Sequence, residues 1–368
     1  MQIGIDCFND LQIRSIIQSE NLKGHCDIQN RGDVWVYDTN KNQVNDLEAN
    51  ISSILSLYAP KNELEDNGRQ SFDLIENRLY TDWRIFSPSI SPTNIRDIVL
   101  AICKSEYSGN ETIFQEPVGL SELSDSSFLK DNCLTGEKTW ENFSNSLKHE
   151  LRFHNHLNLD VLRTLLESET LHLKLNPKIE LYRSRISNDG FYRKEEMGVP
   201  PASKASEGRV NSKGIPCLYL ADTIETTLHE IRARAFDEIT VAKFSPVKTV
   251  NMVDFRQLDK LSPFATIGIG VDWFAVNVEI LHQISQEIAK PMRRNDSVLD
   301  YLPSQYIADF AKRLGYDGIC FSSTLHQGGV NYAVFNEKTF VCNSVKSFQV
   351  KELKFCYKPV GDSNKKKS

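Results

Sequence analysis

Three residues in the stretch Gly208–Ile231 are of types that could act together on a phosphorylated substrate. Tyr219 lies ten residues after Arg209, and Glu230 lies eleven residues after Tyr219. A planar guanidinium group binds phosphate oxygens in pairs, and a carboxylate can stabilise positive charge that develops in a transition state. From spacing alone, a surface helix with Glu230 paired to Arg234 one turn later remains the simpler explanation.

A strand and a helix must position these residues. The strand is predicted over Ile215–Ala221, entered through a Gly214-x-Pro216 turn. Asp222 or Thr223 would cap the following helix, with Glu225 at capping-box distance from Asp222. The apolar stripe of that helix consists of Ile224, Leu228 and Ile231.

Composition and charge exclude several classes of protein. The chain has 368 residues, of which 40% are hydrophobic and 25% charged, typical of a globular protein with two or three domains. Its net charge of -6 gives no domain-wide basic field, so we expect no nucleic-acid partner. No apolar run approaches the ~20 residues of a membrane span, and no signal-peptide pattern opens the chain. We therefore expect no membrane association, a cytoplasmic location and reduced cysteines.

Hydrophobic periodicity predicts an α+β protein in several parts. Residues 1–38 form a small cysteine-containing module, and residues 39–170 form a mainly helical N-terminal domain. Residues 171–357 have regular strand patterns mixed with helices, among them a helix from Pro303 to Gly315 followed by a buried strand. The strand KSFQVKELKFCY would close this domain. The lysine-rich end, 358–368, is expected to be a disordered basic tail.

No metal is expected. Cys7 and Cys26 lack the partners that a C-x-x-C pair would place at Gly4 and Gln29. His229-Glu230 begins like the zinc-protease motif H-E-x-x-H, but Ala233 stands where the second histidine is needed. The histidines of RFHNH, from Arg152 to His156, are interpreted as solvated. The sequence also has no phosphate-binding glycine loop and no G-x-S-x-G nucleophile motif.

The run from Leu181 to Asn336 resembles the RES domain, the toxin domain of RES–Xre toxin–antitoxin systems. The residues that carry this resemblance are Tyr182-Arg183, Gly208-Arg209-Val210-Asn211, Gly214, Pro216, Tyr219, Glu230, Ser323 and Asn331. Val210 departs from the aromatic residue that many relatives carry. The front of the chain is similar to a degenerate cysteine-pair module followed by a HEPN-like region. That region lacks the Arg-x(4–6)-His signature of HEPN ribonucleases, so ribonuclease activity is not expected.

The resemblance implies an ADP-ribosyltransferase-like mixed β core with helices and an enzyme that degrades NAD⁺ as substrate, without another cofactor. It implies catalytic roles for Glu230, Arg209 and Tyr219, although Tyr219 could equally be a core residue. The residues implied to bind NAD⁺ are Arg183, Ser323 (or its neighbour Ser322), Asn211 and Asn331.

The acceptor of the ribosyl group stays open. Water would make the protein an NAD⁺ glycohydrolase, inorganic phosphate an NAD⁺ phosphorylase, and a protein target an ADP-ribosyltransferase. A catalytically inert NAD-binding sensor is the alternative of another class. As a bacterial toxin or defence effector, the protein would need restraint by an antitoxin, another regulatory protein or its own N-terminal half. A homodimer is expected from base rates alone.

Overall fold

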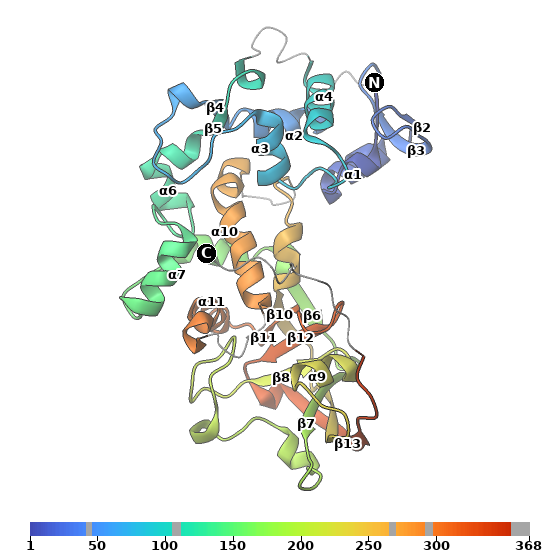
Figure 1. Cartoon of the computed structure of the whole chain (residues 1–368), viewed down its shortest axis with the longest axis vertical. Helices are drawn as coiled ribbons and strands as arrows, with labels where there is room; N and C mark the ends of the chain where they lie inside the picture. The colour runs from blue at the N-terminus through green and yellow to red at the C-terminus, as the bar shows by residue number, and fades with distance from the viewer. Residues whose placement is uncertain (42–45, 105–111, 265–269, 291–296, 355–368) are drawn as a thin grey trace, which may run out of the picture. The chain divides into compact units, whose positions relative to one another are not determined.

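The computed structural model describes residues 1–41, 46–104, 112–264, 270–290 and 297–354, in two compact units (Figure 1). The first unit comprises Met1–His172, Asp254–Ile288 and Ser297–Ser304, and the second comprises Leu173–Val253, Ala289–Asp296 and Gln305–Ser368. Helix α10 (Val271–Ala289) therefore lies almost wholly in the first unit. The sequence places this helix inside the predicted domain 171–357. Its position in the chain does not indicate which hydrophobic core its apolar face packs into.

The first unit opens with a small three-stranded sheet in the order β1-β3-β2, against which helix α1 (Leu11–Ser19) packs. The strands are β1 (Gln2–Gly4), β2 (Lys23–Cys26) and β3 (Arg31–Asp38). The two cysteines of this module meet, with Sγ of Cys7 3.7 Å from Sγ of Cys26. Burial raises the pKa of the Cys7 thiol to about 12, so the group is a protonated thiol at neutral pH.

The rest of the first unit is mainly helical, as its periodicity predicts. A short strand pair, β4 (Tyr58–Pro60) with β5 (Val118–Leu120), was not predicted. The helices are α2 (Asp46–Leu55), α3 (Ile75–Asp82), α4 (Pro92–Ile102), α6 (Ser126–Asn132), α7 (Trp140–His149), α8 (Leu159–Leu166) and α10. The apolar faces of α2, α3 and α4, with Phe274 and Ala275 of α10, form one continuous core.

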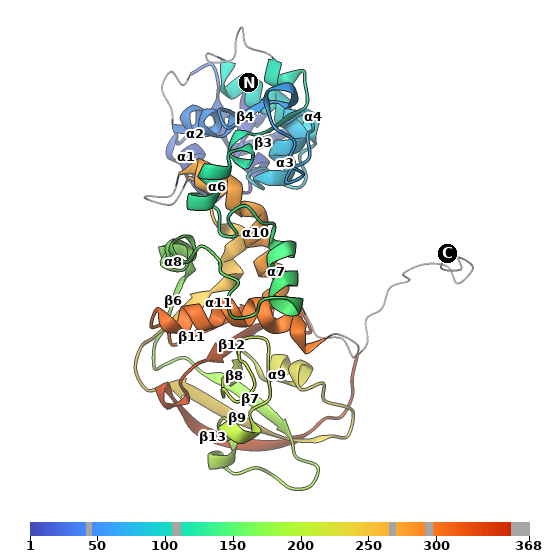
Figure 2. The ribbon, with the colours of Figure 1, turned by 90° about the vertical axis from the view of Figure 1, so that its left-hand side faces the viewer.

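The second unit is built on an eight-stranded sheet in the order β13-β9-β7-β8-β12-β11-β10-β6 (Figure 2). The strands are β6 (His172–Leu175), β7 (Leu181–Ile186), β8 (Leu218–Ala221), β9 (Glu238–Pro246), β10 (Val250–Asp254), β11 (Gly318–Ser322), β12 (Val330–Val334) and β13 (Phe340–Gln349). With helices α9 (Ile224–Glu230) and α11 (Leu302–Arg313), the predicted mixed α+β architecture is confirmed.

The two faces of this sheet carry different groups, because successive residues of a strand point to opposite sides. One face holds the main core of the unit, including Leu181, Leu218, Leu220 and Tyr332. Helix α9 covers the other face and contacts β7 and β8. The Ser184 hydroxyl of β7 forms a hydrogen bond with that of Thr227 in α9, which fixes the helix on this face.

Local predictions differ from the structure at two strand ends. Strand β8 begins at Leu218, and Ile215 is 39% exposed, because Gly214 adopts a φ of +84° in a turn that ends before the strand. Strand β13 ends at Gln349, so described residues 351–354 of the predicted strand KSFQVKELKFCY are irregular. The predicted basic tail, 358–368, lies outside the described residues.

Within the part of the chain that the structure describes, no helix is both long enough and apolar enough to span a membrane.

Candidate active site

Glu230 is the last residue of α9, and the chain turns sharply after it. Thr223 caps the start of the helix by accepting a hydrogen bond from the Thr226 amide, so the cap is Thr223 rather than Asp222. At the other end, the amide of Ala233 donates to the Leu228 carbonyl and that of Arg232 to the His229 carbonyl, the Schellman pattern. Arg232 takes the left-handed position with φ 52°, where glycine is usual.

The carboxylate of Glu230 is held from two strands. Oε1 accepts a hydrogen bond of 2.8 Å from the Ser323 hydroxyl and one of 2.6 Å from the Asn331 side-chain amide. Both donors are buried, at 6% exposure each, whereas Glu230 is half-buried. The pairing with Arg234 that spacing alone favoured is therefore replaced by tertiary hydrogen bonds, and the amide of Arg234 itself donates to Asp237.

Arg209 lies on the same face of the sheet. Its guanidinium carbon is 5.2 Å from the ring centroid of Phe321, a cation–π contact. Phe321 on β11 is directly opposite Asn331 on β12, and residues directly opposite in an antiparallel pair share a face. A continuous row of side chains thus runs from Arg209 through Phe321 and Asn331 to Glu230.

Tyr219 and Asn211 are hydrogen-bonded to each other in the segment that carries Arg209. The Tyr219 hydroxyl donates a hydrogen bond of 2.7 Å to Oδ1 of Asn211, whose Nδ2 donates to the carbonyls of Ser206 and Ile215. Gly208 has no room for a side chain, because a Cβ would lie 2.6 Å from both Asn211 Oδ1 and Tyr219 Oη. The Gly-Arg-x-Asn segment is therefore a hydrogen-bonded loop closed over a tyrosine, and it holds Arg209 in place.

Gln305 of α11 anchors the same loop and was not singled out from the sequence. Its Nε2 donates to the carbonyls of Gly208 and Asn211, and its Oε1 accepts from the Ser212 hydroxyl. The side chain is only 5% exposed. Its separation from the loop by more than ninety residues explains why spacing gave no signal.

Two predicted residues are not brought to this face. Ser322 is exposed and alternates away from Ser323. Arg183 pairs with Ala242, a residue of the main core, so it lies on the core face of the sheet. Tyr182 and Asn331 lie on the other face. The Arg183 guanidinium donates a hydrogen bond to the Gly198 carbonyl. Burial, and secondly the positive charge of Arg185, lower the pKa of Arg183 to about 10. This placement favours a role in the structure rather than in the site.

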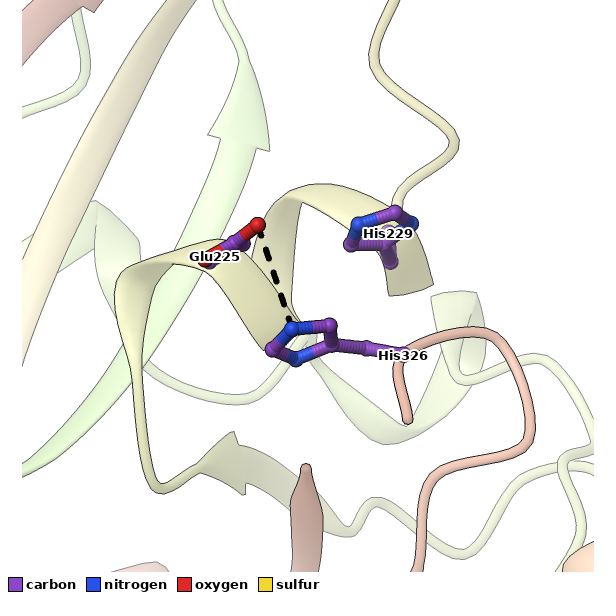
Figure 3. Close-up of side chains that lie close together, drawn as sticks. All are labelled: Glu225, His229 and His326. Atoms are coloured by element: carbon purple, nitrogen blue, oxygen red, sulfur yellow. Dashed lines mark ion pairs between the residues drawn. The ribbon is translucent and has the colours of Figure 1, made fainter. Parts of the chain in front are cut away.

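Beside the Glu230 carboxylate, three further side chains lie close enough to hold a metal ion between them. They are Glu225, His229 and His326, drawn in Figure 3. Spacing had suggested a capping role for Glu225 and had not singled out His326, since the loop that carries it comes close to α9 only in the folded sheet.

Comparisons with known proteins found similarity in the second half of the chain. Residues 180–355 match the family model described as the RES domain. Among solved structures, a chain of the M. tuberculosis MbcT–MbcA toxin–antitoxin complex is similar at 14% sequence identity. That match covers 48% of this chain and 87% of the other, with a TM-score of 0.28. A search of the curated proteins finds no match.

Proposed function

The chain carries a RES domain over residues 180–355, and from this premise we propose that it is an enzyme that cleaves the nicotinamide–ribose bond of NAD⁺. The proposal includes an ADP-ribosyltransferase-like arrangement of the sheet and a role as a toxin or defence effector. The observation that carries it is the Glu230 carboxylate, held by Ser323 and Asn331 on the face that also presents Arg209.

The reaction needs a fixed negative charge beside the ribose. Departure of nicotinamide leaves positive charge on the ribose ring, and a preorganised carboxylate stabilises that charge without reorganising during the reaction. Both donors to Glu230 act on Oε1, and none of the hydrogen bonds among the described residues reaches Oε2. Oε2 is therefore the oxygen assigned to the ribose, while Oε1 fixes the orientation of the group.

Arg209 is assigned to the pyrophosphate. The guanidinium lies over Phe321, and its planar, permanently charged fork suits paired phosphate oxygens. The loop hydrogen bonds of Asn211 and Gln305 hold this arginine before substrate binds, which reduces the entropy lost on binding. Tyr219 supplies a ring to the site, while its hydroxyl is engaged by Asn211.

The attacking group is the part of the reaction that these residues leave open. Water gives ADP-ribose, inorganic phosphate gives a phosphorylated ADP-ribose, and a protein nucleophile gives a modified protein. An antitoxin that restrains the enzyme is part of the proposal, as in other RES–Xre systems. A sensor that binds NAD⁺ without cleaving it would keep Arg209 but would have no need for the two buried donors on Glu230.

Product analysis by NMR tests the proposal. Purified full-length protein is incubated with NAD⁺ in buffers with and without inorganic phosphate, and proton and phosphorus spectra follow nicotinamide and the ribose product. We expect free nicotinamide, with a product whose phosphorus spectrum identifies the acceptor. Intact NAD⁺ that nevertheless binds the folded protein would replace the enzyme by the sensor.

A further inference from the structure

Glu225, His229 and His326 bring three ligand atoms together on the outer side of α9 (Figure 3). Glu225 and His229 are four residues apart and therefore share one face of the helix, and His326 reaches them from the loop between β11 and β12. The three ligand atoms lie within 4.8 Å of one another. Nε2 of His326 is 3.9 Å from Oε1 of Glu225, and the two imidazole rings stack with centroids 5.0 Å apart.

A buried hydroxyl contacts the Nδ1 atom of His326. Oγ1 of Thr226, a fully buried residue, lies 2.9 Å from Nδ1 of His326 and donates its proton to Oδ1 of Asp222 at 2.8 Å. With the Thr226 proton directed to Asp222, Nδ1 of His326 is positioned to donate to Oγ1 of Thr226. In that tautomer the lone pair is on Nε2, the nitrogen that faces Glu225. Histidines that bind metal ions are held in this way by a hydrogen bond from their other nitrogen.

We propose that Glu225, His229 and His326 form a binding site for a divalent transition-metal ion of the zinc class. Two imidazole nitrogens and one carboxylate oxygen are a ligand set of zinc sites that keep a fourth position for water. Glu225 and His229 are exposed, so their side chains can turn to close the separation in Figure 3 to the metal–ligand distance of ~2 Å. His326 is already oriented. The proposal differs from the sequence-based expectation of no metal.

An ion pair without metal explains less of the geometry. Contact between protonated His326 and Glu225 accounts for their separation of 3.9 Å, which is longer than a hydrogen bond. It gives no role to His229, whose ring lies parallel to that of His326 at 4°.

The bound ion would fasten the β11–β12 loop to α9 beside Glu230. The His326 amide donates to the Ser323 hydroxyl, which in turn donates to Glu230. The same loop is packed tightly on the helix, since a Cβ at Gly329 would lie 2.6 Å from Oγ1 of Thr226. With ligands from both segments, the ion would stabilise the two parts of the chain that hold the Glu230 carboxylate. Metal binding does not depend on which reaction that carboxylate performs.

The experiment is a Co²⁺ titration of the full-length protein after treatment with a chelator, followed by visible absorption. Co²⁺ takes the place of Zn²⁺ and absorbs in the visible when its site is tetrahedral or five-coordinate. We expect one equivalent to bind, to be displaced by Zn²⁺, and to show no thiolate charge-transfer band in the near ultraviolet. A charge-transfer band would assign the ion to the cysteines and overturn the proposal, as would the absence of any bound Co²⁺.

Variants then locate the ion. His326→Ala and His229→Ala are each expected to weaken binding by at least about 10-fold, and Thr226→Val by about 10-fold through the orientation of His326. The matched control is His154→Ala with His156→Ala, which removes the exposed histidines of the other candidate cluster and is expected to bind normally. Because His229 is exposed, its variant should fold even if His326→Ala does not. Unchanged binding in His229→Ala, or lost binding in the control, would overturn the proposal.

Discussion

Nδ2 of Asn331 lies 2.6 Å from Oε1 of Glu230, and this hydrogen bond joins a central strand of the sheet to the last residue of α9. Ser323 donates to the same oxygen. The two donors come from neighbouring strands or their ends, and both are buried, so the carboxylate is oriented by the sheet rather than by its own helix. The proposed chemistry depends on that orientation.

Removing the donors should lower the rate in a non-additive way. Ser323→Ala is expected to reduce kcat for nicotinamide release about 10-fold, and Asn331→Ala about 10- to 100-fold, because each leaves the Glu230 carboxylate less fixed. The double variant should lose less than the product of the two effects, since both side chains hold one atom. Steady-state kinetics of the three variants measure this coupling. Strictly multiplicative losses would mean that the two residues act separately.

Ser322→Ala distinguishes the neighbouring serines. The Ser322 side chain is exposed and alternates away from Glu230, so its removal should leave kcat and KM unchanged. A loss in Ser322→Ala equal to that in Ser323→Ala would contradict the orientation of this strand end.

Gly208→Ala should destabilise the second unit. The added Cβ would lie 2.6 Å from both partners of the Tyr219–Asn211 hydrogen bond, and we expect a loss of about 1–3 kcal/mol in the free energy of unfolding. Urea unfolding followed by circular dichroism measures it. All four tryptophans (Trp35, Trp83, Trp140 and Trp273) belong to the first unit, so fluorescence reports on that unit separately.

The control for Gly208 is Gly32→Ala. No atom lies within 4 Å of a Cβ built at Gly32, and the expected change is within about 0.5 kcal/mol. If Gly208→Ala lowers the free energy of unfolding no more than Gly32→Ala does, the loop accommodates the added Cβ without loss of stability.

Cys217 should make the folded protein less stable at alkaline pH. Burial raises the pKa of its thiol from 9.0 to about 12. Between these values the unfolded chain loses the proton while the folded chain keeps it, so the free energy of unfolding falls as pH rises; below the lower value the thiol makes no difference. Urea unfolding at about pH 8 and about pH 10.5 should show a smaller fall in Cys217→Ala than in the original protein. Equal falls would mean that the thiol ionises in the folded state.

Arg183→Met tests whether this arginine serves the structure or the substrate. The guanidinium lies against the core on the face opposite Asn331, and burial disfavours its charge. An apolar side chain of similar length should leave the free energy of unfolding within about 1 kcal/mol, because the lost hydrogen bond to Gly198 is offset by relief of desolvation. KM for NAD⁺ should not change. A large rise in KM with normal folding would return Arg183 to the NAD⁺ site.

The sequence predicted those features that depend on local pattern and on motif order. The apolar stripe of α9 and the strands around it follow from periodicity, and the order of Arg209, Tyr219, Glu230, Ser323 and Asn331 led to the RES domain. It could not choose between Ser322 and Ser323, since both are polar and adjacent; pairing of β11 with β12 makes that choice. Gln305 and His326 gave no signal, because their partners lie far away in the chain. Motif order suggested Arg183 for the NAD⁺ site, but it could not indicate which sheet face this residue occupies; strand pairing places it on the core face.

Release of nicotinamide from NAD⁺ by the protein and by Glu230→Gln tests the central claim most directly. The matched control is Glu180→Gln, which removes a carboxylate of the same unit from a surface ion pair with Lys243. We predict nicotinamide from the original protein and from the control, and a rate at least about 100-fold lower from folded Glu230→Gln. Equal release from Glu230→Gln and the control would contradict the account.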